Sequence, residues 1–187
     1  MPWIPPLEES DAPEASRATA DAHAATGGRM TNMKWTLAHD PAALDALLEW
    51  YPLHDRVVPI LGERRTNLFC HAISVQNDCL ICSTFFRRIL IDSGEDPDAL
   101  EMDAREAAVV AFGRALAQTP HRVPDAVYDP VAAYFGDEQM VALTAFGALM
   151  VATNVINNVL RVPLDDYLQP YRRQPAAAVA EGTGTNG

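Results

Sequence analysis

Two cysteines separated by two residues, Cys79 and Cys82, form the motif with the clearest chemistry in this chain. They follow Asn77 and Asp78 and precede a helical-looking run over residues 83–92. Asp78 is expected to cap that helix with its carboxylate, which would place Cys79 in the first turn and Cys82 about one turn later. Free backbone N–H groups and the positive helix end stabilise a thiolate there and lower its pKa from the usual ~8.5. Because the spacing also allows a reversible disulfide, the motif indicates a redox dithiol.

Two other interpretations of the motif are possible, a zinc site and a pair of core residues. A structural zinc ion needs four ligands, usually from a second closely spaced pair of cysteines or histidines. The third cysteine is Cys70, and the histidines are scattered along the chain: His23, His39, His54, His71 and His121. We therefore predict no metal and no other cofactor. Burial of both thiols as small apolar residues remains the main alternative, since free cysteine is often buried.

Length, charge and hydropathy limit the possible functions. A chain of 187 residues with 49% hydrophobic content can bury one substantial core, which predicts a single domain. A net charge of −11 leaves no basic surface for nucleic acid and would repel anionic membranes. No uninterrupted run of about 18 apolar residues is apparent, and the start of the chain does not resemble a signal peptide. We expect a soluble cytoplasmic protein, and thiols are kept reduced in that compartment, which favours a catalytic dithiol.

Helical periodicity without alternating strand patterns predicts an all-α protein. Residues 1–12 are rich in proline and acidic side chains and should form an extended arm, followed by a helical domain over residues 13–173 and a disordered tail over 174–187. Pro52 and Pro59 are expected to mark a break or kink. Helices are expected over about residues 13–25, from Asp40-Pro41 onward, over 62–75, from the cysteine motif to about 93, and over 103–117, 124–135 and 137–160, with a last turn over 165–171. Asp103 and Glu106 are spaced as in a capping box at the start of the helix over 103–117.

Several short segments, taken in order, resemble one known family. They are Trp-Ile-Pro-Pro at 3–6, Thr-Asn-Met at 31–33, Leu-Ala-His-Asp-Pro at 37–41, Asn-Asp-Cys-Leu-Ile-Cys at 77–82, Asn-Val-Ile-Asn-Asn at 154–158 and Val-Pro-Leu-Asp at 162–165. Together they resemble the carboxymuconolactone decarboxylase and alkylhydroperoxidase D (AhpD-like) superfamily, in its peroxidase-related branch. The resemblance implies an all-α AhpD-like fold that forms homo-oligomers.

The resemblance also implies a chemistry. In redox members of the superfamily, the motif is Glu-x11-Cys-x2-Cys-x3-His, and the dithiol reduces a peroxide. Carried onto this chain, Cys82 would attack the hydroperoxide and Cys79 would resolve the product as a disulfide. An external dithiol reductant would then restore both thiols. The implied function is that of a thiol-dependent oxidoreductase with antioxidant, alkylhydroperoxidase-like activity.

The chain departs from that motif at both proton-relay positions. Asn67 stands where the family has glutamate, and Phe86 stands where it has histidine. Neither can relay a proton, and general acid–base assistance is typically worth ~10²–10⁴-fold, so we expect weak or specialised activity. The two side chains would still line the substrate site. His71 follows Asn67 by one helical turn and is a candidate displaced base, the alternative being a histidine held in the core or an interface.

Two further functions remain open at this point. The fold could persist as a non-catalytic binding or assembly module, or the protein could be a carboxymuconolactone-type decarboxylase, although Cys-x-x-Cys marks the redox branch. Arg87 and Arg88 could recognise an anionic substrate or partner, but the preferred interpretation is a pair of surface arginines that offset a very acidic chain. Asn154, Asn157 and Asn158 lie on an otherwise apolar helix, and Asn154 and Asn158 share one face of it. Because buried amides need partners, hydrogen bonds between helices or subunits are expected here in preference to a catalytic role.

Overall fold

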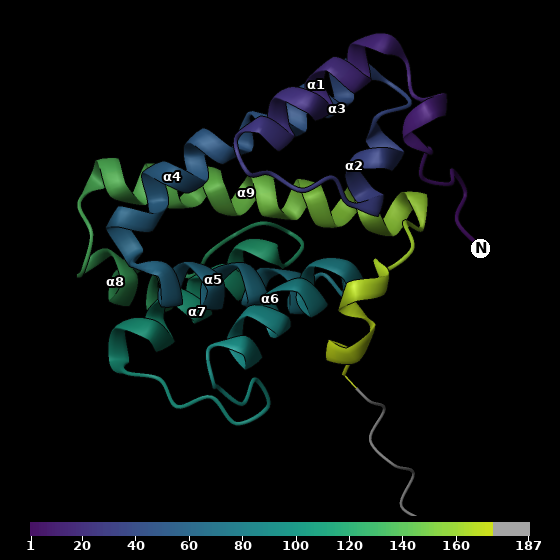
Figure 1. Ribbon diagram of the computed structural model, residues 1–187. Helices are drawn as coiled ribbons and strands as arrows, with labels where there is room; N and C mark the ends of the chain where they lie inside the picture. The colour runs from purple at the N-terminus through teal and green to yellow at the C-terminus, as the bar shows by residue number, and fades with distance from the viewer. Residues whose placement is uncertain (174–187) are drawn as a thin grey trace, which may run out of the picture.

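The computed structural model describes residues 1–173, and within them every regular element is helical (Figure 1). The α-helices are α1 (Glu14–Ala25), α2 (Asn32–Leu37), α3 (Pro41–Leu48), α4 (Trp50–Leu61), α5 (Glu63–Gln76), α6 (Leu80–Asp92), α7 (Ala104–Ala117), α8 (Asp125–Ala132) and α9 (Asp137–Leu160). Two 3-10 turns, η1 (Glu9–Asp11) and η2 (Asp166–Tyr171), flank them. The predicted all-α fold is confirmed, whereas the tail predicted over 174–187 lies outside the described residues.

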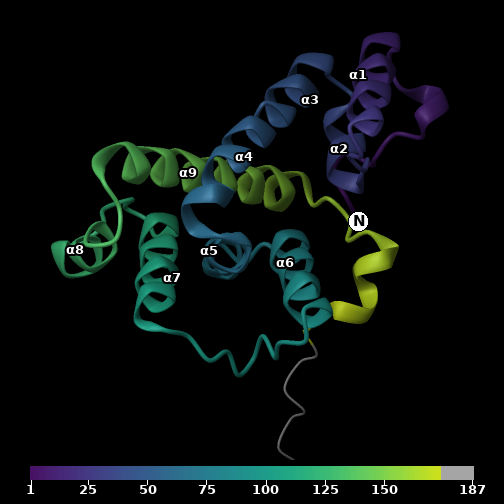
Figure 2. The same ribbon diagram turned by 60° about the vertical axis from the view of Figure 1, so that its left-hand side comes forward.

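Helix α5 is the centre of the larger half of the molecule. It packs against α6, α7 and α9, and Figure 2 shows α6 and α7 on either side of it with α9 across the top. The ring of Phe69 is fully buried and stacks on Phe112 of α7 and Phe146 of α9, at centroid distances of 6.3 and 6.4 Å. A Cβ on either Gly113 or Gly147 would lie 2.9 Å from the Phe69 ring. The two glycines therefore allow α7 and α9 to approach α5 closely.

The helix starts that depend on local capping agree with the sequence analysis. The side chain of Asp40 accepts a hydrogen bond from the N–H of Ala43 at the start of α3. At the start of α7, Asp103 and Glu106 form the capping box predicted for them. Of the break or kink expected at Pro52 and Pro59, the break is wrong, since α4 runs through both, and the kink stays a prediction. Pro52 is the third residue of the helix, where a backbone N–H has no partner within the helix, so proline costs little there.

The first 48 residues form a smaller layer on the other side of α9. In Figure 1 α1, α2 and α3 lie above α9, while α5, α6 and α7 lie below it. Leu37, Leu44 and Leu47 form the buried centre of this layer. The N-terminal arm rests on the same chain, because the N–H of Trp3 bonds to the carbonyl of Leu160 at the end of α9.

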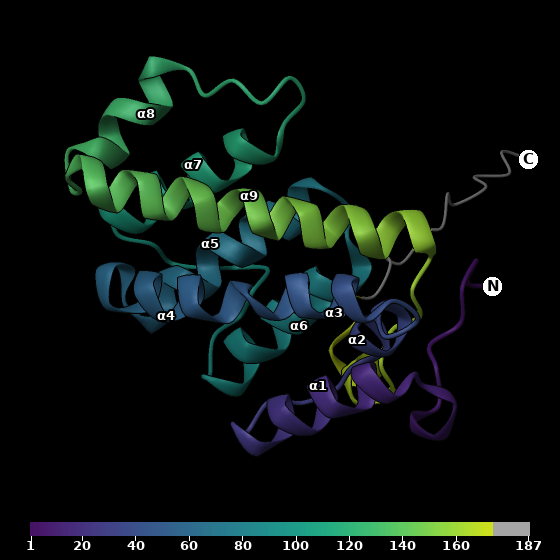
Figure 3. The same cartoon turned by 90° about the horizontal axis from the view of Figure 1, so that it is seen from above.

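Helix α9 has one buried face and one exposed face. Figure 3 shows it crossing the molecule from end to end, with α4 alongside. An 18-residue stretch of α9 has a mean hydropathy of 1.6, so by length and composition this helix could cross a membrane. Thr144, Thr153 and Asn154 interrupt its apolar residues, so the expectation about an uninterrupted apolar run is not contradicted. Of that stretch, 44% is buried inside the protein, and a core helix of a soluble protein meets the same criterion.

Candidate dithiol site

The connection between α5 and α6 places the two thiols. Asp78 has a positive φ of 49° and ends α5, with its N–H bonded to the carbonyl of Val75, while the N–H of Cys79 bonds to the carbonyl of Ser74. These two bonds form a Schellman motif, which ends a helix. The prediction that Asp78 caps α6 is therefore wrong, because Cys79 itself occupies the N-cap position and Cys82 is the third residue of α6.

One amide from α9 joins both sulfurs. Asn157 Nδ2 donates to Cys82 Sγ at 3.3 Å and lies 3.8 Å from Cys79 Sγ. The Asn157 side chain is buried, and its Oδ1 has no hydrogen-bond partner within residues 1–173. The sequence analysis singled out Asn157 with its two neighbours as amides that bond between helices, but it did not connect Asn157 with the thiols.

The two thiols differ in proton affinity. A hydrogen bond from the Cys82 side chain, followed by the N–H groups of Cys82 and Ile81 and the Asn157 amide, lowers the pKa of Cys79 to about 7 against the opposing effect of burial. The hydrogen bond to Cys79, together with burial, raises the pKa of Cys82 well above its usual value. At pH 7 about half of the Cys79 thiols are therefore ionised, while Cys82 keeps its proton.

Apolar side chains cover the pair. Cys79 is 0% and Cys82 is 7% exposed, and both pack with Ile81 and Val162, against which Met33 of α2 rests. Helix α2 is fixed to the same region, because the side chain of Asn32 donates to the carbonyl of Pro163. Of the two cysteines, Cys82 is the more exposed.

The other predicted site residues lie apart from the hydrogen bonds of the dithiol. His71 lines a cavity with Arg87 and Asp98, and within residues 1–173 its ring makes no hydrogen bond to either thiol. Burial and then the charge of Arg87 lower the pKa of His71 to about 4, so its ring is neutral at pH 7. Asn67 is half-buried on α5, and Phe86 is half-buried and packs against the main core. The proposed roles of these three residues stay predictions.

The remaining polar residues singled out on α9 hold helices together. The hydroxyl of Ser74 on α5 donates to Asn154 Oδ1, and Asn158 Nδ2 donates to the carbonyl of Asn77. Both agree with the expectation that these amides bond between helices. Cys70 is 1% exposed, and burial raises its pKa, so it is a packed thiol as predicted.

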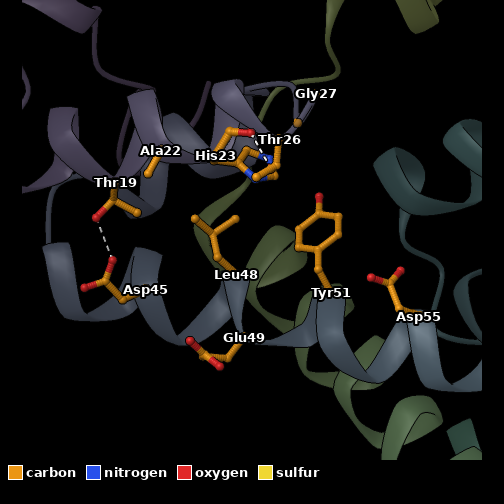
Figure 4. Close-up of a pocket in the computed structure, with 11 residues that line it drawn as sticks. Thr19, Ala22, His23, Thr26, Gly27, Asp45, Leu48, Glu49, Tyr51 and Asp55 are labelled. Carbon is orange, nitrogen blue, oxygen red and sulfur yellow. Dashed lines mark hydrogen bonds between the residues drawn. The ribbon is translucent and has the colours of Figure 1, made fainter.

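A cavity of about 650 Å³, with no cysteine in its lining, lies between α1, α3 and the start of α4. His23 and Tyr51 point into it (Figure 4). Behind it, the buried ammonium of Lys34 donates to the Tyr51 hydroxyl at 2.7 Å and contacts His23 Nε2 at 2.6 Å. Because neutral polar groups already accept the hydrogen bonds of this ammonium, we interpret the cluster as a structural contact that holds α1 and α2 in place.

No protein-family model and no curated protein sequence matches the chain. Solved structures do resemble it. An AhpD core from Ralstonia eutropha, an uncharacterised peroxidase-related protein, is 21% identical, with a TM-score of 0.71 over 89% of this chain and 94% of its own. The debrominase Bmp8 without ligand is 17% identical, with a TM-score of 0.69 over 90% and 95%. A peroxidase-related protein from Silicibacter is 14% identical, with a TM-score of 0.68 over 89% and 94%.

A cysteine-to-alanine variant of the debrominase, in complex with 2,3,4-tribromopyrrole, matches with a TM-score of 0.67 at 17% identity. At these identities the likeness establishes the fold. The chain has the AhpD-like all-α fold that the sequence resemblance implied, and its structural neighbours include peroxidase-related proteins and an enzyme.

Proposed function

We propose that this protein is a thiol-dependent oxidoreductase in which Cys79 and Cys82 cycle between dithiol and disulfide while a hydroperoxide is reduced. The observation that carries the proposal is the hydrogen-bonded arrangement of the two sulfurs around Asn157 Nδ2, with the pKa of Cys79 lowered to about 7. A buried structural pair of thiols would have raised pKa values at both positions. A thiolate held near neutral pH is what dithiol chemistry requires.

The proposed first step uses Cys79 as the internal base. The Cys79 thiolate takes the proton of Cys82 while the Cys82 sulfur attacks the terminal peroxide oxygen, so that the S–O bond forms and the O–O bond breaks. The alkoxide that leaves takes this proton from Cys79 and departs as an alcohol. In the family motif, glutamate and histidine relay this proton, and Asn67 and Phe86 stand at their positions here. In this scheme Cys79 carries the proton in their place.

The second step closes the disulfide. The Cys79 thiolate attacks the Cys82 sulfenic acid, the S–S bond forms and hydroxide leaves, so two electrons have passed from the thiols to the peroxide. An external dithiol then reduces the disulfide, which fits a protein of the reducing cytoplasm. Turnover should be slow because the sulfurs are covered and one buried thiol performs both proton transfers.

We also propose that the protein is a homo-oligomer that pairs through the exposed face of α9. The residues of this face recur at alternating intervals of four and three, as in the seam between two helices of a coiled coil. They are Val141, Ala145, Ala148, Ala152, Val155 and Val159, all of which are exposed. Small side chains at the centre allow close approach of a second copy, and Val141 is 68% exposed in the single chain.

A brominated aromatic is the second candidate substrate, because a debrominase shares the fold over 90% of this chain. Reduction of a C–Br bond by a dithiol has the same electron count: two thiols give a disulfide, the carbon gains hydrogen and bromide leaves. We therefore include 2,3,4-tribromopyrrole, the compound bound to the debrominase variant, beside the hydroperoxide in the test.

The test is thiol titration after addition of tert-butyl hydroperoxide or 2,3,4-tribromopyrrole, on wild type and Cys82→Ser, with Cys70→Ser as the matched control. Wild type and Cys70→Ser should each lose two thiols to one of these compounds and regain them with dithiothreitol, while Cys82→Ser should lose none. Wild-type thiols that survive both compounds, in a protein that is folded by circular dichroism, would favour the non-catalytic alternative.

A further inference from the structure

A second cavity lies on the face of α6 opposite to Cys82. Its volume is about 360 Å³, within the range of small-molecule sites. Leu80, Ser83, Thr84 and Arg87 of α6 line it, at positions that share one helical face, whereas Cys82 lies on the other side of the helix. Helices α5 and α7, the connection between α6 and α7, and the residues after η2 form the other walls, and no cysteine lines the cavity.

Four arginines and one carboxylate line this cavity. Arg87 Nη2 donates to Asp98 Oδ2 at 2.6 Å, and Arg173 Nε lies 3.2 Å from Asp98 Oδ1, so Asp98 holds two guanidinium groups. Within residues 1–173, Arg114 and Arg172 make no ion pair. The lining therefore carries an excess of positive charge, in a chain whose net charge is −11.

Arg87 is part of the wall and not of the outer surface. Its side chain is only 17% exposed, and its Nε is buried without a hydrogen-bond partner among the described residues. The sequence interpretation of Arg87 as a surface arginine is therefore wrong. An unpartnered guanidinium N–H in a cavity wall is a donor that a ligand can satisfy.

The positive field reaches the interior of the cavity. After burial, the charges of Arg87 and Arg114 contribute most to lowering the pKa of His71. The rest of the surface is largely apolar: Leu68, Ala72, Val75, Leu80, Leu100, Met102 and Val110. The cavity thus combines guanidinium donors with an apolar floor, which would favour a ligand that has both an anionic group and a hydrocarbon body.

We propose that this cavity binds a small organic carboxylate, with its carboxylate on Arg87 and Arg114 and its apolar body against Leu68, Ala72 and Val110. Guanidinium groups bind carboxylates through paired N–H donors, which a flexible ammonium matches less well. Inorganic phosphate would satisfy the arginines but leave the apolar floor in contact with water. Because no cysteine lines the cavity, this site does not depend on the proposed redox function.

The test is calorimetric titration of the wild-type protein with benzoate, with benzyl alcohol and inorganic phosphate as the neutral and inorganic comparisons. Arg114→Gln removes a guanidinium that makes no ion pair within the described residues, so the fold should tolerate it, and Arg114→Lys keeps the charge. Arg122→Gln, in the exposed segment before α8, is the matched control. Benzoate should bind saturably to wild type and Arg122→Gln, and at least about fivefold more weakly to Arg114→Gln, with partial recovery in Arg114→Lys.

Three results would overturn the proposal. The first is the absence of saturable benzoate binding up to ~10 mM. The second is an equal loss of affinity in Arg114→Gln and Arg122→Gln. The third is a comparison compound that binds as tightly as benzoate. Equal binding of phosphate would mean that the apolar floor does not contribute, and equal binding of benzyl alcohol would mean that the arginines do not.

Discussion

Replacing Asn157 by leucine tests the electrostatic arrangement of the dithiol. The substitution keeps roughly the volume of the side chain and removes the only amide that donates to both sulfurs within residues 1–173. A hydrogen bond to a charged group is worth about 1.5–3 kcal/mol, and the contact with Cys79 Sγ is long at 3.8 Å, so the lower end applies. At 1.36 kcal/mol for each pKa unit, the pKa of Cys79 should rise by about one unit, from about 7 to about 8.

The measurement is the rate of alkylation by iodoacetamide as a function of pH. The tryptic peptide of residues 66–87 contains all three cysteines, so fragment spectra assign each adduct. At pH 7 the thiolate fraction of Cys79 should fall from about one half to about one tenth in Asn157→Leu, which lowers its alkylation rate about fivefold. Asn157→Asp should raise the pKa further, because it adds a like charge beside the thiolate.

The matched control is Asn158→Leu, which removes an exposed amide bonded to the carbonyl of Asn77. Its alkylation profile should equal that of wild type. If Asn157→Leu and wild type share the same pH midpoint for Cys79, the amide does not stabilise the thiolate and the reasoning fails.

Three further predictions concern access, acid stability and assembly. Met33→Ala removes a side chain that covers the cysteines, so alkylation of Cys82 at fixed pH should accelerate severalfold; an unchanged rate would mean that the substrate path lies elsewhere. Because burial lowers the pKa of His71 to about 4 from its ordinary value of 6.5, the unfolded chain binds more protons between these pH values. Wild type should therefore lose about 2–3 kcal/mol more stability to urea unfolding than His71→Gln as pH falls through this window, and parallel curves would contradict it. Val155→Glu places a charge in the exposed seam of α9 and should give a single chain near 20.4 kDa by light scattering, where wild type gives a multiple; equal masses would refute pairing through this face.

The sequence predicts those parts of the fold that depend on local interactions. The Asp40-Pro41 start and the Asp103–Glu106 capping box each involve residues within one turn, and both are found in the structure. Asp78 was misplaced because the connection between α5 and α6 is so short that one polar residue could end the first helix or begin the second. Its left-handed backbone, which sequence alone does not fix, decides between these two arrangements.

The site was only partly predictable because its residues come from segments that lie far apart in the sequence. Cys79 and Cys82 are recognisable from spacing, but Asn157 meets them from 78 and 75 residues away. Nothing in local periodicity selects one amide of α9 over its neighbours as the partner of a thiol. The depth of Arg87 is likewise a tertiary property, since the segment that contains Asp98 folds back over α6.

Trapping of sulfenic acid by dimedone tests the central claim most directly. After one equivalent of tert-butyl hydroperoxide, wild type should show a disulfide between Cys79 and Cys82 in the peptide of residues 66–87. A Cys70→Ser/Cys79→Ser double variant leaves Cys82 as the only thiol. It also removes the charge interaction with Cys70 that raises the pKa of Cys82. Because the Cys79 base is absent from this variant, the account predicts a dimedone adduct on Cys82 that forms more slowly than the wild-type disulfide. It predicts no adduct on Cys79 in a Cys70→Ser/Cys82→Ser variant. An adduct found only on Cys79, or a wild type that forms no disulfide, would contradict it.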